Sequence, residues 1–323
     1  MSLKKVVAEI KKHKSFLITA HTNLEGDALG SELAFYFLVK SLGKDAMVVN
    51  EDETPAEYQF LPGTNIIKRY RSNMKNLDFD CFVAVDCSDP QRTGEVYRLN
   101  KEQKPVINVD HHISNKYFGD TNWVDPHASS ASEMVFELYK KMGVKFSDES
   151  ALCLYVGIMM DTGSFRYSNT TSTTHRAVSE LLKHKINVVE VYKYLHENIP
   201  YQDMRLLAKL LPTFKRTAGG KIIWCQIKHN LLKNKRLAFD LTDSLLTYAR
   251  AIKDMEVCVL LKENLGVHNE VRINLRSQGK VDVNKIAASF GGGGHKTAAG
   301  ATIQGNINSI RRKVLAKIKE NLK

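Results

Sequence analysis

The 323-residue chain is poor in cysteine and has no long apolar run. It has an odd number of cysteines, five, with none in C-x-x-C spacing, which argues against a disulfide framework or a zinc ribbon and favours a reducing compartment. The longest apolar stretch, 151–160, is far shorter than the roughly 18–20 residues of a membrane helix. The apolar segment 16–20 is too short for a signal peptide. We therefore expect a soluble, cytoplasmic protein with no membrane partner.

An excess of positive charge is missing from the first 200 residues and is confined to the rest of the chain. Residues 1–200 hold 24 Lys and Arg against 26 Asp and Glu, a net charge of −2. Residues 201–323 hold 23 against 9, a net charge of +14. This asymmetry indicates a polyanionic partner such as nucleic acid, nucleotide or phosphate. The alternative is a basic surface that serves solubility only.

Short apolar runs alternate with helical patterns in the first half of the chain. The runs 16–20, 46–50, 81–86 and 106–110 are bounded by polar or turn residues and predict buried strands. Apolar residues recur at helical spacing over 28–42, and further helices are expected near 148–160 and 174–183. This alternation predicts an α/β domain with a parallel sheet and helices on both faces.

A second block of strand-like runs begins near Lys221. It includes 222–227, 257–261 and 271–275, and it leads to four consecutive glycines, Gly291–Gly294. At about 150 residues per domain, the chain length also suggests two domains. We predict a first domain at 1–187, a helical connector containing Pro200 at 188–211, and a smaller basic α/β domain at 212–323 that ends in an amphipathic helix.

Ionisable residues follow the predicted strands at the points where they end. Because such ends meet at one edge of a parallel sheet, the following residues are expected in one crevice: His21, Glu25, Asp27, Asp86, Asp110, His111, His112 and, after a helix, Asp161. So many carboxylates would repel each other unless cations neutralised them. Mixed imidazole and carboxylate ligands suit Mn²⁺, Fe²⁺, Co²⁺ or Zn²⁺, and six or seven ligands predict two ions that share a carboxylate. Two such ions are suited to attack on phosphorus.

The glycine run forms a second signal. Residues Gly291–Gly294 are followed by His295 and Lys296 in the basic domain. Glycines allow backbone N–H groups to approach an anion closely, and the two side chains add charged donors. The run therefore predicts a phosphate clamp, with a flexible loop as the alternative.

These motifs together resemble the DHH phosphoesterases, named for the triplet Asp110-His111-His112. The similarity extends over nearly the whole chain, because Gly291–His295 with 298–300 resembles the DHH-associated domain. The short two-domain branch with nanoRNases and 3′-phosphoadenosine 5′-phosphate (pAp) phosphatases is most similar. Family II pyrophosphatases lack the C-terminal signature, and RecJ-type exonucleases carry a further domain. The resemblance implies an active site in an interdomain cleft.

The resemblance also implies a role for each candidate residue. His21, Glu25 and Asp86 would bind one metal ion, and Asp27, Asp86, His111 and Asp161 a second. Asp110 would orient His111, and His112 would contact the scissile phosphate and protonate the leaving oxygen. The following would hold the substrate: Arg276, His295 and the backbone of Gly291, Gly292, Gly293 and Gly294. Arg92 and Arg166 are further substrate candidates or structural ion-pair partners.

One motif departs from the family pattern. Glu25 stands where an Asp is usual, and Leu24 replaces a Pro, so the first metal site is expected to be displaced, weaker or selective for another ion. The implied function is Mn²⁺-dependent hydrolysis of short oligoribonucleotides (nanoRNA, pGpG, pApA) or pAp. The alternatives are a cyclic-dinucleotide phosphodiesterase, a RecJ-like single-strand exonuclease, and a nucleotide- or RNA-binding protein with a decayed catalytic site. A homodimer fits the resemblance.

Overall fold

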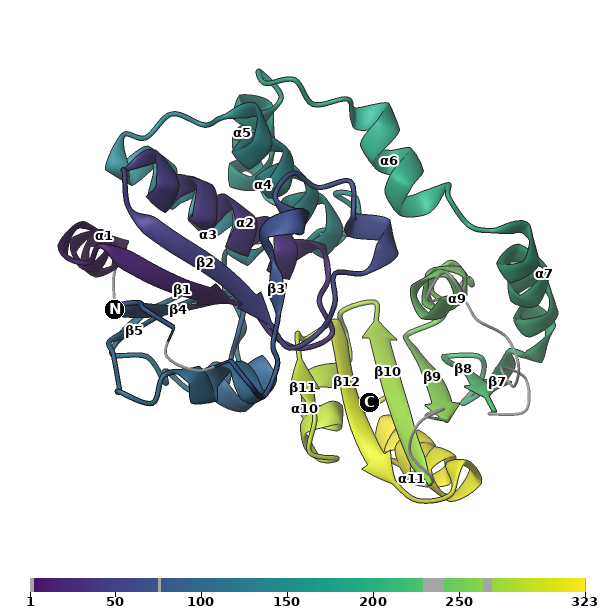
Figure 1. Ribbon diagram of the computed structural model, residues 1–323. Coiled ribbons are helices and arrows are strands. Elements are labelled where there is room, and N and C mark those ends of the chain that lie inside the picture. The colour runs from purple at the N-terminus through teal and green to yellow at the C-terminus, as the bar shows by residue number, and fades with distance from the viewer. Residues whose placement is uncertain (1–2, 75–76, 229–240, 264–268, 323) are drawn as a thin grey trace. The chain divides into compact units, whose positions relative to one another are not determined.

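The computed structural model describes residues 3–74, 77–228, 241–263 and 269–322 (Figure 1). The chain forms two compact units, 1–198 and 199–323. The division falls inside the segment 188–211 that we predicted as a connector. This segment contains helix α6 (Val188–His196) in the first unit and helix α7 (Tyr201–Leu210) in the second, with Pro200 directly before α7. The 3₁₀ turn η4 (Leu211–Thr213) follows.

A six-stranded sheet forms the centre of the first unit, in the order β3-β2-β1-β4-β5-β6. The strands are β1 (Ser15–Thr19), β2 (Asp45–Asn50), β3 (Lys68–Arg69), β4 (Cys81–Val85), β5 (Val106–Asp110) and β6 (Thr121–Val124). All neighbouring strands pair in parallel, which confirms the predicted sheet. The chain moves outward from β1 toward one edge and from β4 toward the other. The strand order therefore reverses between β1 and β4, where open α/β sheets bind ligands.

The α-helices pack on one face of this sheet, and a 3₁₀ segment packs on the other (Figure 1). The α-helices are α1 (Leu3–Lys12), α2 (Gly26–Ser41), α3 (Ala131–Met142), α4 (Asp148–Asp161) and α5 (Ser172–Leu181). Phe16 and Ile18 point into the core that α1 to α4 share with the sheet. Leu17, on the opposite face because strand residues alternate, packs with Val96 of the 3₁₀ segment η3 (Pro90–Leu99). Two further 3₁₀ turns, η1 (Ala56–Tyr58) and η2 (Thr64–Ile66), precede β3.

Glycines allow α2 and α4 to pack closely and antiparallel. A Cβ atom at Gly30 would collide with the Cys153 carbonyl oxygen and would lie 3.1 Å from the Cα atom of Gly157. A Cβ atom at Gly26, at the start of α2, would collide with Met160 near the end of α4. The start of α2 and the end of α4 therefore lie side by side, which brings Asp27 and Asp161 to the same end of the helix pair.

The second unit also contains a six-stranded sheet, in the order β11-β12-β10-β9-β8-β7. Its strands are β7 (Lys215–Thr217), β8 (Ile222–Ile227), β9 (Val257–Glu263), β10 (Glu270–Ser277), β11 (Gly293–Gly294) and β12 (Ala298–Gln304). Only β8 and β9 pair in parallel among these described strands. Helices α10 (Val283–Ala288) and α11 (Ile307–Glu320) cover one face, and α7 and α9 (Leu241–Arg250) cover the other.

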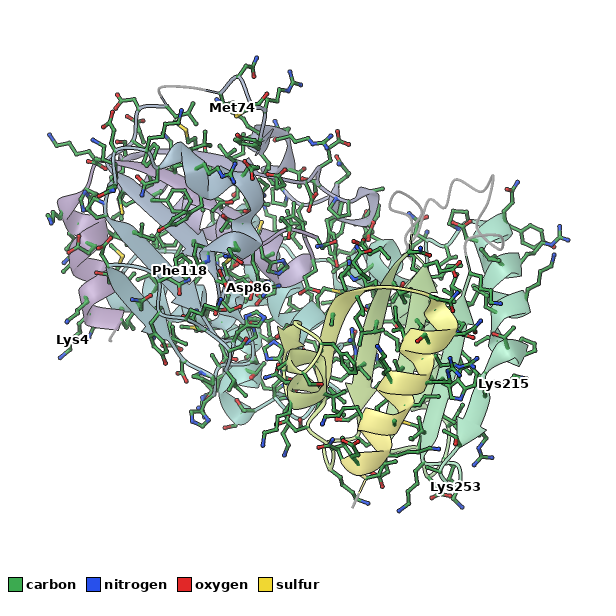
Figure 2. The ribbon with its side chains drawn as sticks, turned by 90° about the horizontal axis from the view of Figure 1, so that it is seen from below. Lys4, Met74, Asp86, Phe118, Lys215 and Lys253 are labelled. Atoms are coloured by element: carbon green, nitrogen blue, oxygen red, sulfur yellow. The ribbon has the colours of Figure 1, made fainter. Side chains whose placement is uncertain are left out.

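The predicted C-terminal amphipathic helix is present as α11, with Ile310, Val314 and Ile318 buried. Figure 2 shows basic side chains such as Lys215 and Lys253 pointing outward from this second unit. In the described ranges, no helix has the length and apolar character needed to cross a membrane.

Candidate metal centre

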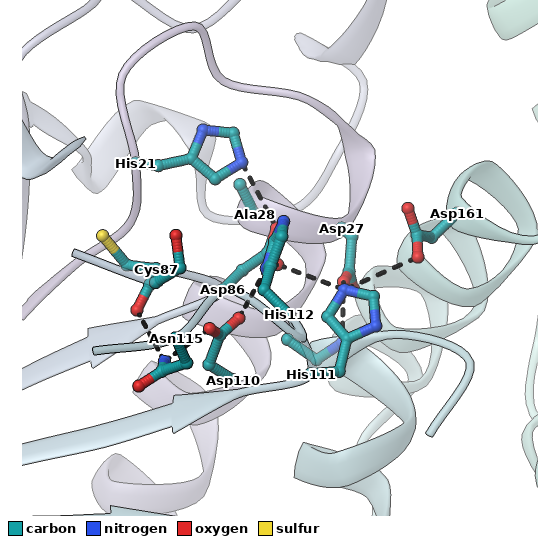
Figure 3. A network of polar contacts seen from close by, with 12 residues as sticks. His21, Asp27, Ala28, Asp86, Cys87, Asp110, His111, His112, Asn115 and Asp161 are labelled. Carbon is teal, nitrogen blue, oxygen red and sulfur yellow. Dashed lines mark hydrogen bonds and ion pairs between the residues drawn. The ribbon is translucent and has the colours of Figure 1, made fainter. Parts of the chain in front are cut away.

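Asp86 stands at the centre of the polar cluster at the carboxyl ends of β1, β4 and β5 (Figure 3). It follows β4 directly and has a φ of +52°, and its backbone N–H donates to the Val109 carbonyl oxygen at 2.9 Å. Its Oδ2 atom lies 3.4 Å from His21 Nε2, and its Oδ1 atom lies 3.4 Å from His111 Nε2. The two carboxylate oxygens thus face two different imidazoles, as expected of a bridging ligand.

His21, Glu25 and Asp86 form the first group of potential ligands, with their ligand atoms within 4.8 Å of one another. His21 Nδ1 lies 2.7 Å from the Thr22 carbonyl oxygen, so Nδ1 carries the donated proton and Nε2 faces the other two residues. Glu25 Oε1 is 3.6 Å from His21 Nε2. The His21 side chain is only 3% exposed whereas that of Glu25 is 59% exposed, so this group opens to solvent on the Glu25 side.

Asp27, His111 and Asp161 form a second group around the other oxygen of Asp86. His111 Nε2 lies 3.6 Å from Asp27 Oδ2 and 3.6 Å from Asp161 Oδ2. Asp27 also accepts hydrogen bonds from the backbone N–H groups of Ala131 (2.7 Å) and Ser132 (2.8 Å) at the start of α3. These donors hold the Asp27 carboxylate in place, and the sequence analysis missed both of them together with α3.

The charges of the two groups do not balance without cations. Burial, reinforced by Asp86, raises the pKa of Asp27 to about 6, and burial raises the pKa of Asp161 well above its usual range. Burial and Arg92 lower the pKa of His21, but Asp86 and Glu25 outweigh them and raise it to about 10. His21 Nε2, Asp86 Oδ1 and Asp161 Oδ2 are buried and make no hydrogen bond. Unsatisfied ligand atoms on mixed imidazole and carboxylate groups fit divalent transition-metal ions.

Asp110 contacts His112 directly, and its orienting role toward His111 stays a prediction. Its Oδ1 atom lies 2.6 Å from His112 Nδ1. Its Oδ2 atom accepts a hydrogen bond from Asn115 Nδ2 at 2.5 Å. The Asp110 carboxylate therefore accepts a hydrogen bond from His112 Nδ1. Burial raises the pKa of Asp110, but the nearby imidazole outweighs burial and holds this pKa below its usual value.

Two asparagines support this pair and were missed by sequence reasoning. Asn115 also donates to Asn108 Oδ1 at 2.8 Å. Asn108 in turn donates to the Cys87 carbonyl oxygen at 2.9 Å. The available signal was the polar Asn108 inside an otherwise apolar strand, since a buried amide needs hydrogen-bond partners.

The two arginine candidates of the first unit occupy different surroundings. Arg92 lies on η3, partly buried, with Nη1 3.5 Å from Ser88 Oγ, and its charge acts on His21. Arg166 is exposed, and its Nε donates to the Gly163 carbonyl oxygen at 2.7 Å, in the loop after Asp161. In the described parts of the chain, neither forms an ion pair with a carboxylate.

The glycine run forms a turn that leads into the short strand β11. The N–H groups of Gly291 and Gly292 donate to the Ala288 and Ala287 carbonyl oxygens at the end of α10, at 3.0 and 2.9 Å. A Cβ atom at Gly292 would collide with the Gly300 carbonyl oxygen of β12. Close backbone packing therefore explains this glycine, and the N–H groups of Gly291 and Gly292 are used within the fold rather than by an anion.

The remaining substrate candidates lie in the second unit. Gly293 and Gly294 form β11 and pair with β12. His295 donates its backbone N–H to the Ala298 carbonyl oxygen at 2.6 Å. Arg276 lies on β10, where its Nη1 is 3.2 Å from the Leu275 carbonyl oxygen. Their role in substrate binding stays a prediction.

Comparison with known proteins agrees with this architecture. Residues 15–158 match the model of the DHH family, N-terminal domain, and residues 231–320 match that of the DHHA1 domain. A bifunctional oligoribonuclease and PAP phosphatase of Thermus thermophilus is 31% identical over 322 residues, which cover 98% of this chain and 94% of that protein. A cyclic-di-AMP phosphodiesterase of Geobacillus thermodenitrificans is 30% identical over 317 residues, 94% of this chain but 46% of that protein.

Solved structures show the same fold. An exopolyphosphatase-related protein of Bacteroides fragilis superposes with a TM-score of 0.88 at 24% identity. The alignment covers 98% of this chain and 95% of that chain. At this identity the likeness establishes the fold of both units and nothing about the reaction.

Proposed function

The chain belongs to the DHH family, and from this premise we propose that it is a phosphoesterase that hydrolyses short oligoribonucleotides and pAp. DHH phosphoesterases are metal-dependent, and this chain has acidic and histidine groups able to bind metal. The observation that carries the proposal is Asp86, whose two oxygens face His21 and His111 at the point where the strand order reverses. The relative from Thermus thermophilus bears both activities in its name.

We assign the ligands to two Mn²⁺ ions. His21, Glu25 and Asp86 would hold one, and Asp27, Asp86, His111 and Asp161 the other. When bound, such ions supply an activated water and stabilise negative charge on phosphate oxygens. Asp86 places the two groups next to each other, and the N–H groups at the start of α3 fix the orientation of Asp27.

His112 gives a proton to the leaving group, and Asp110 holds His112 in place for this step. The Asp110 carboxylate orients the His112 imidazole through its contact with Nδ1. His112 then gives its Nε2 proton to the leaving oxygen and keeps the proton on Nδ1. Asn115 holds Asp110 in the orientation that this transfer requires.

The second unit is proposed to bind the substrate. Its excess of positive charge attracts a short polyanion. Arg276 and His295 are the side chains assigned to the terminal phosphate, and Arg92 is assigned to the phosphate near His21. Gly293 and Gly294 remain candidates for backbone contacts, whereas the N–H groups of Gly291 and Gly292 do not.

A substrate panel tests the proposal. The panel contains pAp, pApA, pGpG, cyclic di-AMP, and RNA of two, five and twenty-four nucleotides, each with Mn²⁺. Asp86→Ala removes the shared ligand, and Asp45→Ala removes a carboxylate of the same unit whose side chain is 89% exposed. We expect release of mononucleotides from the shortest RNAs and of phosphate from pAp, loss of both with Asp86→Ala, and full activity with Asp45→Ala.

Other outcomes point to the other functions. Preference for the longest RNA would indicate a RecJ-like exonuclease, and turnover of cyclic di-AMP above all others would indicate a cyclic-dinucleotide phosphodiesterase. Binding of the panel without turnover would refute the proposal in favour of a binding protein with a decayed site.

A further inference from the structure

A buried acid on α2 has no place in the mechanism above. Glu32 lies five residues beyond Asp27 and is 0% exposed. Its Oε1 atom accepts a hydrogen bond from Asn50 Nδ2 at 2.7 Å, and its Oε2 atom is buried without a hydrogen-bond partner. Burial raises the pKa of Glu32 to about 8, so the group is mostly a neutral acid at pH 7. An apolar residue would be the usual choice at such a site, because burying a polar group is unfavourable.

The partner of Glu32 connects it to the strand that leads to His21. Asn50 is the last residue of β2, and its side-chain oxygen accepts from the Thr19 hydroxyl and from the Ala20 N–H, both at 3.2 Å. Thr19 ends β1, and Ala20 directly precedes His21. The Asn50 side chain thus continues the β1–β2 pairing beyond Ile18 and Val48, at the point where β1 turns toward His21.

The orientation of the Asn50 amide depends on an acceptor at position 32. If the amide were flipped, its NH₂ group would face the Ala20 N–H, and its oxygen would face Glu32 Oε1. Both contacts would be repulsive if the Glu32 proton lies on Oε2 or is absent. The Glu32 oxygen therefore favours the orientation in which Asn50 accepts the Ala20 N–H.

We propose that Glu32 is a positioning residue for the first metal site: through Asn50 it fixes the backbone at Ala20 and hence the imidazole of His21. This inference rests on the proposed function, in which His21 binds a metal ion. Groups that orient metal ligands typically change metal affinity by about 10- to 100-fold when they are removed. Glu32 needs to be an acceptor in this role, and it does not need to be charged.

Mn²⁺ binding by the metal-free full-length protein tests this role, with calorimetric titration as the readout and thermal unfolding alongside. Glu32→Met keeps the length of the side chain and removes the acceptor. We therefore expect the affinity for one of the two Mn²⁺ ions to fall by about tenfold or more. Glu32→Gln keeps an oxygen for Asn50, so we expect wild-type affinity. Leu38→Ala, at a fully buried position farther along α2, should lower the melting temperature and leave Mn²⁺ affinity unchanged.

Two results would overturn the inference. One is wild-type Mn²⁺ affinity in a folded Glu32→Met protein, and the other is an equal loss of affinity in Glu32→Gln. If Glu32→Met does not fold, Asn50→Ala tests the same link, because it removes the acceptor of the Ala20 N–H. Weaker Mn²⁺ binding by Asn50→Ala would then support the inference, and wild-type affinity would overturn it. A wild-type protein that binds no Mn²⁺ would overturn the proposed function, and this inference with it.

Discussion

Replacing Asp110 with asparagine removes one of the two carboxylate oxygens that accept hydrogen bonds from His112 and Asn115. Asp110 accepts from His112 Nδ1 at 2.6 Å and from Asn115 Nδ2 at 2.5 Å. An asparagine offers one oxygen and one NH₂ group. Either its NH₂ group faces the Asn115 amide, which is also a donor, or it faces His112 Nδ1 and displaces the proton there. In the first orientation the buried Asn115 donor loses its partner, and in the second His112 Nδ1 accepts a hydrogen bond instead of donating one.

The size of the effect follows from these contacts. A hydrogen bond to a charged group contributes about 1.5–3 kcal/mol, and removal of a general acid slows a reaction by about 10²- to 10⁴-fold. We therefore expect Asp110→Asn to lower kcat on pApA by about 10²-fold or more. Mn²⁺ affinity should change little, since Asp110 belongs to neither proposed ligand set.

The assay compares two leaving groups at saturating Mn²⁺. A nucleoside 5′-(p-nitrophenyl) phosphate releases a phenolate that needs no proton, so Asp110→Asn should be nearly as active as the wild type on this substrate. Adding Asn115→Asp should restore part of the lost kcat on pApA, because the donor and acceptor of this pair are then exchanged. An equal loss of kcat on both substrates would refute the proton transfer by His112. An unchanged kcat of Asp110→Asn on pApA would refute the role of the Asp110–His112 contact.

Three further predictions concern other parts of the first unit. Glu25→Asp restores the shorter carboxylate and should tighten Mn²⁺ binding in calorimetric titration; unchanged or weaker binding would contradict the expectation for this site. In metal-free protein the pKa of His21 is raised from 6.5 to about 10, so its contribution to the free energy of unfolding is fully present below pH 6.5 and disappears as the pH rises through 10. Urea unfolding of EDTA-treated wild type and His21→Asn should therefore differ more at pH 7 than at pH 10, and a constant difference would argue against this. Gly30→Ala should lower the free energy of unfolding by about 1–3 kcal/mol through its collision with the Cys153 carbonyl oxygen, and wild-type stability would contradict that packing.

The location of the site could be predicted because local patterns coincide with the sheet. The strand runs 16–20, 81–86 and 106–110 differ from β1, β4 and β5 by no more than one residue at any end. Each is an apolar run with an ionisable residue at its end or directly after it, and parallel pairing brings these ends together without any further information. The short edge strands β3 and β6 were not predicted, since two and four residues carry too little periodicity.

The contact between Asp110 and His112 was not predicted, although the sequence held a signal for it. Because successive residues of an extended chain point to opposite sides, residues 110 and 112 are expected to share a side, which agrees with the Asp110–His112 contact. The glycine run held no such signal. A flexible loop, an anion-binding loop and a closely packed strand can all have this glycine-rich composition. Which of them forms here depends on β12, which pairs with the glycines of β11.

Contacts distant in sequence also determine how Asp27 and Asp161 meet. Asp27 lies at the start of α2 and Asp161 at the end of α4, and neither motif shows that the two helices touch. Gly30 allows α2 to approach the backbone of α4. A Cβ atom at Gly157 would collide with Ser132 and would lie 3.0 Å from Asp27 Oδ1. The small residues of the helix contact therefore determine the distance between two proposed ligands of one metal ion, although neither glycine has a side chain to contribute to the chemistry.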